Sequence, residues 1–152
     1  MEYVYLNSIN AFLACKKIAI AGVSSDTKKF ANIIFKELEN KGYELYPINP
    51  KLDEYQGKMC YKTISSLPDG VEAVVLVTPK KIAEELVGKI SQKGIKQLWI
   101  QPGAETIEAI ALAKSLNMNV IHHQCILMFG NPMPFYHKIH KGINQLFGKY
   151  PK

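Results

Sequence analysis

The sequence contains no arginine: all nineteen of its basic residues are lysine, although the formal net charge is +6. Arginine provides a planar fork that binds phosphates and guanine edges through two bonds at once, whereas lysine acts as a point charge. Its absence weakens the case for a nucleic-acid partner that the net charge would otherwise suggest. The charge is also uneven, because residues 109–152 hold lysines and all four histidines but none of the thirteen acids.

Cysteine and long apolar stretches are scarce as well. Cys15, Cys60 and Cys125 are widely spaced and form no CxxC pair, which favours a reducing compartment over a disulfide framework. No apolar run approaches the roughly 20 residues of a membrane helix, and the N-terminus lacks a basic leader followed by an apolar block. We therefore expect a cytoplasmic protein that does not bind a membrane.

Apolar blocks alternate with amphipathic stretches through the middle of the chain. The blocks typical of strands are 18–21, 43–48, 73–77, 98–100 and 120–121. Apolar residues at helical spacing lie between them: Phe30, Ile33, Ile34 and Leu38, then Ile82, Leu86 and Ile90. Strands that alternate with helices imply right-handed crossovers. The pattern predicts an α/β fold, a Rossmann-like doubly wound and mostly parallel sheet of five to six strands with helices on both faces.

Further elements are predicted outside this alternation. Residues 7–14 are expected to form a short opening helix, residues 58–61 a short strand, and Thr78 an N-cap before Pro79. Residues 135–150 place apolar side chains on roughly one helical face, for packing against the domain or, alternatively, for a dimer contact or a membrane surface. With 47% apolar residues, 1–152 is expected to be a single domain with a core at about 16–128 and helical extensions at both ends.

The first predicted strand ends in Gly22-Val23-Ser24-Ser25, just before an amphipathic stretch. In open parallel sheets the strand ends and helix N-termini form the ligand crevice, and their N–H groups favour an anion such as a phosphate. The dinucleotide fingerprint GxGxxG is broken here, because its second glycine is missing. The hydroxyls of Ser24 and Ser25 and the backbone amides could still bind a phosphate, with charge from the nearby Lys28 and Lys29. A simple turn is the alternative.

Asn49-Pro50-Lys51 follows the second predicted strand. Proteins that hold the ribose diol of NAD commonly place Asp or Glu about 20 residues past the glycine loop. An acid would repel a ribose phosphate, whereas Asn and Lys would accept one. The predicted ligand therefore carries a 3′-phospho-ADP or 2′-phospho-ADP moiety, with Lys29 and Lys51 as its charge partners. Turn chemistry with a solvated Lys51 is the alternative.

Eight short motifs occur in a fixed order, at residues 20–24, 29–32, 42–50, 57–61, 67–68, 77–79, 99–104 and 125–128. This order resembles the small stand-alone CoA-binding domain family, a Rossmann-type fold related to the CoA-binding part of succinyl-CoA synthetase. The resemblance covers about residues 16–128 and does not extend past Phe129. Ala31 departs from the family pattern, which commonly has glycine there.

The resemblance implies a role for each motif. Gly22, Val23 and Ser24 would line the nucleotide, Lys29 and Asn49-Pro50-Lys51 would meet its phosphates and ribose, and Thr78 and Pro79 would border the adenine. Gln101, Pro102, Gly103 and Cys125 would mark the strand ends toward the pantetheine arm. The cofactor implied is coenzyme A or an acyl-CoA.

The sequence predicts no catalytic residue and no metal site. His122, His123 and Cys125 lie close together, and His137 and His140 follow, but neither group has zinc-ligand spacing. Cys125 could form a mixed disulfide with the CoA thiol or be activated by a neighbouring histidine, and an inert core cysteine is the alternative. A ligase would also need an ATP-binding domain, for which 152 residues leave no room.

The expected function is binding of coenzyme A or an acyl-CoA at the carboxyl ends of the strands, by a carrier, sensor or regulatory module without its own turnover. An NADP-linked reductase or redox sensor of the same broad fold is the alternative. A nucleic-acid or anionic-surface adaptor that uses the basic C-terminal residues is a third class. Neither nucleic acid nor membrane is an expected partner, whereas a second copy of the chain or a separate enzyme subunit is.

Overall fold

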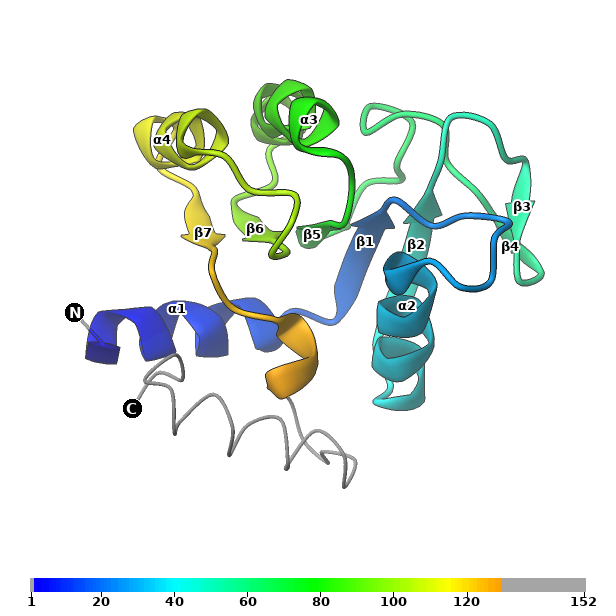
Figure 1. The fold of residues 1–152 in the computed structure, drawn as a ribbon, viewed down its shortest axis with the longest axis horizontal. Coiled ribbons are helices and arrows are strands. Elements are labelled where there is room, and N and C mark those ends of the chain that lie inside the picture. Colours follow the sequence, from blue (N-terminus) through cyan, green and yellow to red (C-terminus); the bar gives the residue numbers. More distant parts are fainter. Residues whose placement is uncertain (1, 130–152) are drawn as a thin grey trace.

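The computed structural model describes residues 2–129, which form a parallel sheet covered by helices (Figure 1). The strands of the sheet are β1 (Lys17–Ala21), β2 (Glu44–Ile48), β5 (Ala73–Leu76), β6 (Gln97–Ile100) and β7 (Asn119–Ile121). Their order is β2-β1-β5-β6-β7, and every neighbouring pair is parallel. The order reverses at β1, so the switch point of this doubly wound sheet lies between β1 and β5. The predicted fold class is confirmed, with five strands in the main sheet.

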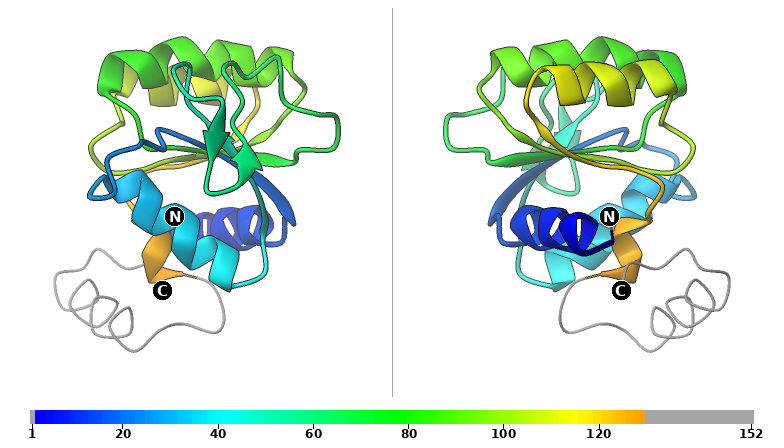
Figure 2. Two further views of the ribbon diagram at one scale, coloured as in Figure 1. Left: turned by 90° about the vertical axis from the view of Figure 1, so that its right-hand side faces the viewer. Right: turned by 90° about the vertical axis from the view of Figure 1, so that its left-hand side faces the viewer.

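Helices cover both faces of the sheet. They are α1 (Glu2–Leu13), α2 (Phe30–Asn40), α3 (Lys80–Gln92) and α4 (Ile107–Ser115), with a short 3-10 helix η1 at Ile126–Met128. Figures 1 and 2 show α3 and α4 side by side on one face, and α1 and α2 on the opposite face. Because both faces are covered, the central strands are continuously apolar, and all four residues of β5 are buried.

The sheet separates two apolar clusters, and successive residues of a strand alternate between them. In β1, Ile18 and Ile20 belong to the cluster on the side of α1 and α2, while Ala19 and Ala21 belong to the other. Trp99 of β6 is fully buried on the first side, where it packs edge-on against Phe12 of α1 with ring centroids 5.3 Å apart. The alternation is the two-residue period of a strand, with a core on each face.

The predicted apolar faces of two helices are only partly correct. Phe30 and Ile33 of α2 are 44% and 43% exposed, and Ile82 of α3 is 41% exposed. The predicted positions Ile34, Leu38 and Ile90 are buried, and the other buried positions are Ala31, Asn32 and Phe35 in α2 and Ala83 and Val87 in α3. The prediction was based on large apolar residues alone. Alanines are also buried, and their small side chains let each helix lie close to the sheet, which shifts the buried face.

Residues 58–61 do not add a sixth strand to the main sheet. Lys58–Met59 (β4) pairs antiparallel with Glu54–Tyr55 (β3) in a separate hairpin, whose turn residues Gln56 and Gly57 both have positive φ. The opening helix is longer than predicted, at Glu2–Leu13. The predicted helix at 135–150 lies outside the described residues.

The N-cap of α3 is Pro79, so the expected cap at Thr78 is wrong by one residue. Pro79 has an extended ψ of 152°, and the helix begins only at Lys80. None of the helices within residues 2–129 combines the length and apolarity needed to cross a membrane.

Candidate functional site at the carboxyl edge of the sheet

The strand register aligns the carboxyl ends of four strands. Ala21 of β1 is level with Ile48 of β2 and with Leu76 of β5, which is in turn level with Ile100 of β6. The residues that follow these strands therefore lie along one edge of the sheet. Each predicted site residue at this edge either follows one of these strands directly or belongs to the loop that connects the strand to the next element. Sheets of this topology bind ligands at that edge, beside the switch point.

Gly22 is the tightest point of this edge. Its φ of +113° is strained for any residue with a side chain, and a Cβ placed there would lie 2.2 Å from the carbonyl oxygen of Val77. The same Cβ would be 3.5 Å from the backbone nitrogen of Thr78. The turn after β1 thus packs directly on the end of β5, which requires glycine at this position and brings Thr78 next to the loop.

Asn32 of α2, which the sequence analysis did not single out, organises the loop after Gly22. The side chain is 9% exposed, and its Oδ1 accepts the N–H of Ser24 at 3.0 Å. Its Nδ2 donates to the carbonyl oxygens of Ser24 at 2.8 Å and of Asp26 at 2.9 Å. A buried polar residue in the first turn of an amphipathic helix was the signal that could have revealed it, because a buried amide needs partners.

A second asparagine connects this loop with the turn after β2. Asn49 donates from Nδ2 to the carbonyl oxygen of Val23 at 2.7 Å, while its Oδ1 accepts the N–H of Lys51 at 2.7 Å. Both ends of the Asn49 amide are therefore used within the protein. Asn49 thus ties the two predicted binding segments, Gly22–Ser25 and Asn49–Lys51, to each other.

The predicted site residues of these two segments differ in accessibility. Val23 is fully buried, with its backbone as well as its side chain inside the protein. Ser24 and Asn49 are half-buried, and the exposed residues are Ser25, Lys29, Pro50 and Lys51. Across the switch point Thr78 is half-buried and Pro79 is exposed. The lysine side chains therefore lie where an anion could reach them.

Gln101 and Cys125 meet at the ends of β6 and β7. Gln101 is 1% exposed, accepts the N–H of Ile126 on Oε1 at 2.8 Å, and lies with Nε2 3.5 Å from the Cys125 sulfur. Pro102 and Gly103 are exposed. Gly103 has a φ of +99°, and a Cβ placed on it would have no neighbouring atom within 4 Å. The structure thus brings together the residues that the resemblance assigned to the pantetheine arm.

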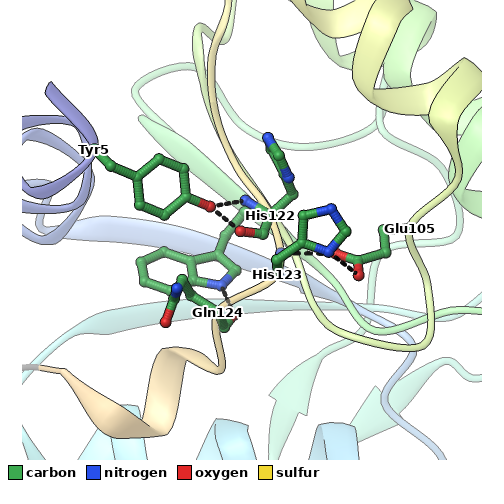
Figure 3. A network of polar contacts seen from close by, with 6 residues as sticks. Tyr5, Glu105, His122, His123 and Gln124 are labelled. Atoms are coloured by element: carbon green, nitrogen blue, oxygen red, sulfur yellow. Dashed lines mark hydrogen bonds and ion pairs between the residues drawn. The ribbon is translucent and has the colours of Figure 1, made fainter. Parts of the chain in front are cut away.

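A polar network that the sequence did not predict lies just beyond, at the end of β7 (Figure 3). Glu105 accepts from His123 twice, from Nδ1 at 2.7 Å and from the backbone N–H at 2.8 Å. The hydroxyl of Tyr5 from α1 donates to the carbonyl oxygen of His122 and accepts its N–H at 2.7 Å. Burial raises the pKa of Tyr5 to about 12, so the hydroxyl keeps its proton.

The two histidines are in edge-on contact, with ring centroids 4.6 Å apart. Burial, followed by the charge of His123, lowers the pKa of His122, whose Nδ1 is buried and has no hydrogen-bond partner within residues 2–129. No group of three or more His, Cys, Asp or Glu side chains in this part of the chain is placed to hold a metal ion. His137 and His140 lie outside it.

Residues 16–131 match the family model of the CoA binding domain. The chain belongs to this family. Among relatives, the alpha subunit of acetate–CoA ligase [ADP-forming] II from Pyrococcus furiosus is 29% identical over 129 residues, 78% of this chain. Only 28% of that ligase subunit is matched, so this CoA-binding domain protein spans less than a third of its length.

Small proteins of similar length are also related. The uncharacterized protein YneT from Bacillus subtilis is 29% identical over 114 residues, which cover 73% of this chain and 82% of YneT. A hypothetical protein from Pyrococcus horikoshii OT3 has a solved structure with a TM-score of 0.75 and 34% identity, covering 79% of this chain and 85% of that one. The chain is thus similar both to part of a longer ligase subunit and to most of two shorter proteins.

Proposed function

We propose that this CoA-binding domain protein binds coenzyme A or an acyl-CoA along the carboxyl edge of its sheet, in the cytoplasm, as a carrier, sensor or regulatory module without turnover of its own. The observation that carries the proposal is the family match over residues 16–131. Support comes from the strand register, which gathers the residues after β1, β2, β5 and β6 at one edge beside the switch point.

In this proposal the ligand lies across the strand ends. The loop after Gly22 receives the pyrophosphate, and the exposed Lys29 and Lys51 pair with the phosphates, including the 3′-phosphate on the ribose. Thr78 and Pro79 border the adenine. The pantetheine arm runs toward Gln101, Pro102, Gly103 and Cys125, which meet at the ends of β6 and β7.

A separate enzyme subunit is the protein partner that we propose, with a second copy of the chain as the other candidate. Relatives of this chain are named as subunits of ADP-forming acetate–CoA ligases, and they are much longer. In such a reaction this CoA-binding domain would act together with the parts of a ligase that lie outside the matched region.

Titration calorimetry with CoA, 3′-dephospho-CoA, NADP and NAD tests the proposal. CoA is expected to bind most tightly, 3′-dephospho-CoA at least about tenfold more weakly because one charge-assisted contact is lost, and NAD not at all. NADP bound more tightly than CoA would instead favour the NADP-linked alternative. No heat with CoA, and no displacement of a bound ligand by it, would contradict the proposal.

A further inference from the structure

The loop after β1 is unevenly hydrogen-bonded. Side chains bond the carbonyl groups of Val23, Ser24 and Asp26: Asn49 holds the first, and Asn32 holds the other two. In contrast, the backbone N–H groups of Val23, Ser25 and Thr27 have no partner among residues 2–129. Three acceptors are thus satisfied inside the protein, while the unpaired donors of Ser25 and Thr27 belong to exposed residues and that of Val23 to a buried one.

This difference matters for an anion. A carbonyl oxygen carries a partial negative charge that repels a phosphate, whereas open N–H groups in a turn before a helix attract one. Asn32 is 9% exposed and comes from the first turn of α2, so its amide fixes the loop to the helix from the inside. The same amide also takes up one donor of the loop, because its Oδ1 accepts the N–H of the half-buried Ser24.

We propose that Asn32 is a positioning residue for the phosphates of the ligand: its amide binds the carbonyl oxygens of Ser24 and Asp26 and keeps the loop in the shape that leaves the N–H groups of Ser25 and Thr27 open. The inference rests on the proposed function, because it deepens the description of the same site. Asn32 itself does not touch the ligand.

Asn32→Asp tests the inference with nearly the same side-chain shape. The carboxylate can still accept the N–H of Ser24, but it cannot donate to the two carbonyl oxygens. The matched control is Asn40→Asp, which adds the same charge to the same helix at its exposed last residue. Asn32→Ser is the second variant, because it removes both donated bonds without adding charge.

Calorimetry with CoA and 3′-dephospho-CoA, and NMR shifts with pantetheine, separate positioning from general damage. Both Asn32 variants are expected to bind CoA and 3′-dephospho-CoA at least about tenfold more weakly, since both ligands carry the pyrophosphate. Pantetheine has no phosphate, so its binding should change less than about twofold. Asn40→Asp should match the wild type for all three ligands.

The outcomes are distinct for each idea. If the wild type binds CoA but folded Asn32 variants bind it as well as Asn40→Asp does, the positioning role is wrong and the proposed function stands. Equal losses for pantetheine and CoA, or failure of both Asn32 variants to fold, would also overturn the role, because Asn32 would then support the fold in general. If the wild type binds none of the ligands, the proposed function itself fails.

Discussion

At the scale of single residues, the carboxyl edge depends on a few side chains with many partners. Asn32 and Asn49 use their amides to join the loop after β1, the first turn of α2 and the turn after β2. Gly22 permits the contact between the ends of β1 and β5. These residues shape the proposed site, in which the exposed Lys29 and Lys51 are predicted to supply the charge.

Gly22→Ala should destabilise the protein by roughly 2 kcal/mol or more, because it adds a close contact with the Val77 carbonyl to the strain of a positive φ. Urea unfolding followed by circular dichroism measures the change. The control is Gly94→Ala, which has a φ of +87° but open space around its Cβ and should cost less. Equal losses for both variants would contradict the importance of the Val77 contact.

Lys51→Ala should weaken CoA binding by about 1 to 3 kcal/mol, because a charge-assisted bond to the 3′-phosphate is lost. Affinity for 3′-dephospho-CoA should stay the same, and calorimetry with both ligands reveals the difference. Lys36→Ala is the control, since Lys36 is exposed on α2 and has no proposed role. A CoA affinity unchanged by Lys51→Ala would show that Lys51 is a solvated surface lysine without a role in binding.

At the scale of elements, α1 is held on the sheet by contacts at both of its ends. The Tyr5 hydroxyl binds the backbone of His122 after β7, and the Tyr43 hydroxyl donates to the carbonyl oxygen of Leu13 at 2.9 Å. Between them Asn119 of β7 donates to the carbonyl oxygen of Ser8 at 2.9 Å. Because α1 lies against the edge strand β7 and is bonded to His122, a change in the charge of His122 should alter the stability of the folded protein.

Stability should fall on mild acidification because of His122. Burial lowers its pKa in the folded protein, so below the ordinary value of about 6.5 the unfolded chain binds the proton more readily. The contribution is present above about pH 6.5 and is lost as the pH falls toward the lower folded pKa. Urea unfolding between pH 5 and pH 7.5 measures this slope.

His122→Asn should flatten that slope. His123→Gln should retain most of it, because burial affects the His122 pKa more than the charge of His123 does. An identical slope in His122→Asn and the wild type would show that other groups cause the pH dependence.

Strands were easier to predict from the sequence than helix faces and side-chain networks. Buried parallel strands form short apolar blocks, so 18–21 and 98–100 were found within one or two residues. The buried face of α3 was predicted only in part, at Ile90, because it also uses Ala83 and Val87. The pair of Glu105 and His123 joins residues from two different loops, and no local pattern announces such a contact.

At the scale of the whole molecule, the predicted site residues come together because parallel strands share one edge. Gly22 follows the end of β1 at that edge, and Cys125 contacts Gln101 after the end of β6. The two faces of the sheet hold separate apolar clusters. The positions of the site residues could therefore be predicted from strand order, whereas the hydrogen bonds of Asn32 and Asn49 required the fold. Binding by these residues is still a prediction.

NMR titration of the isotopically labelled protein with CoA tests binding at this edge most directly. The backbone amides of 22–29, 49–51, 78–79, 101–103 and 125 are expected to shift together and to saturate with a single dissociation constant. The chemical shifts of amides at the opposite edge, beside Lys17, Glu44 and Glu72, should not change. An unchanged spectrum at saturating CoA, or shifts confined to that opposite edge, would contradict the proposed site.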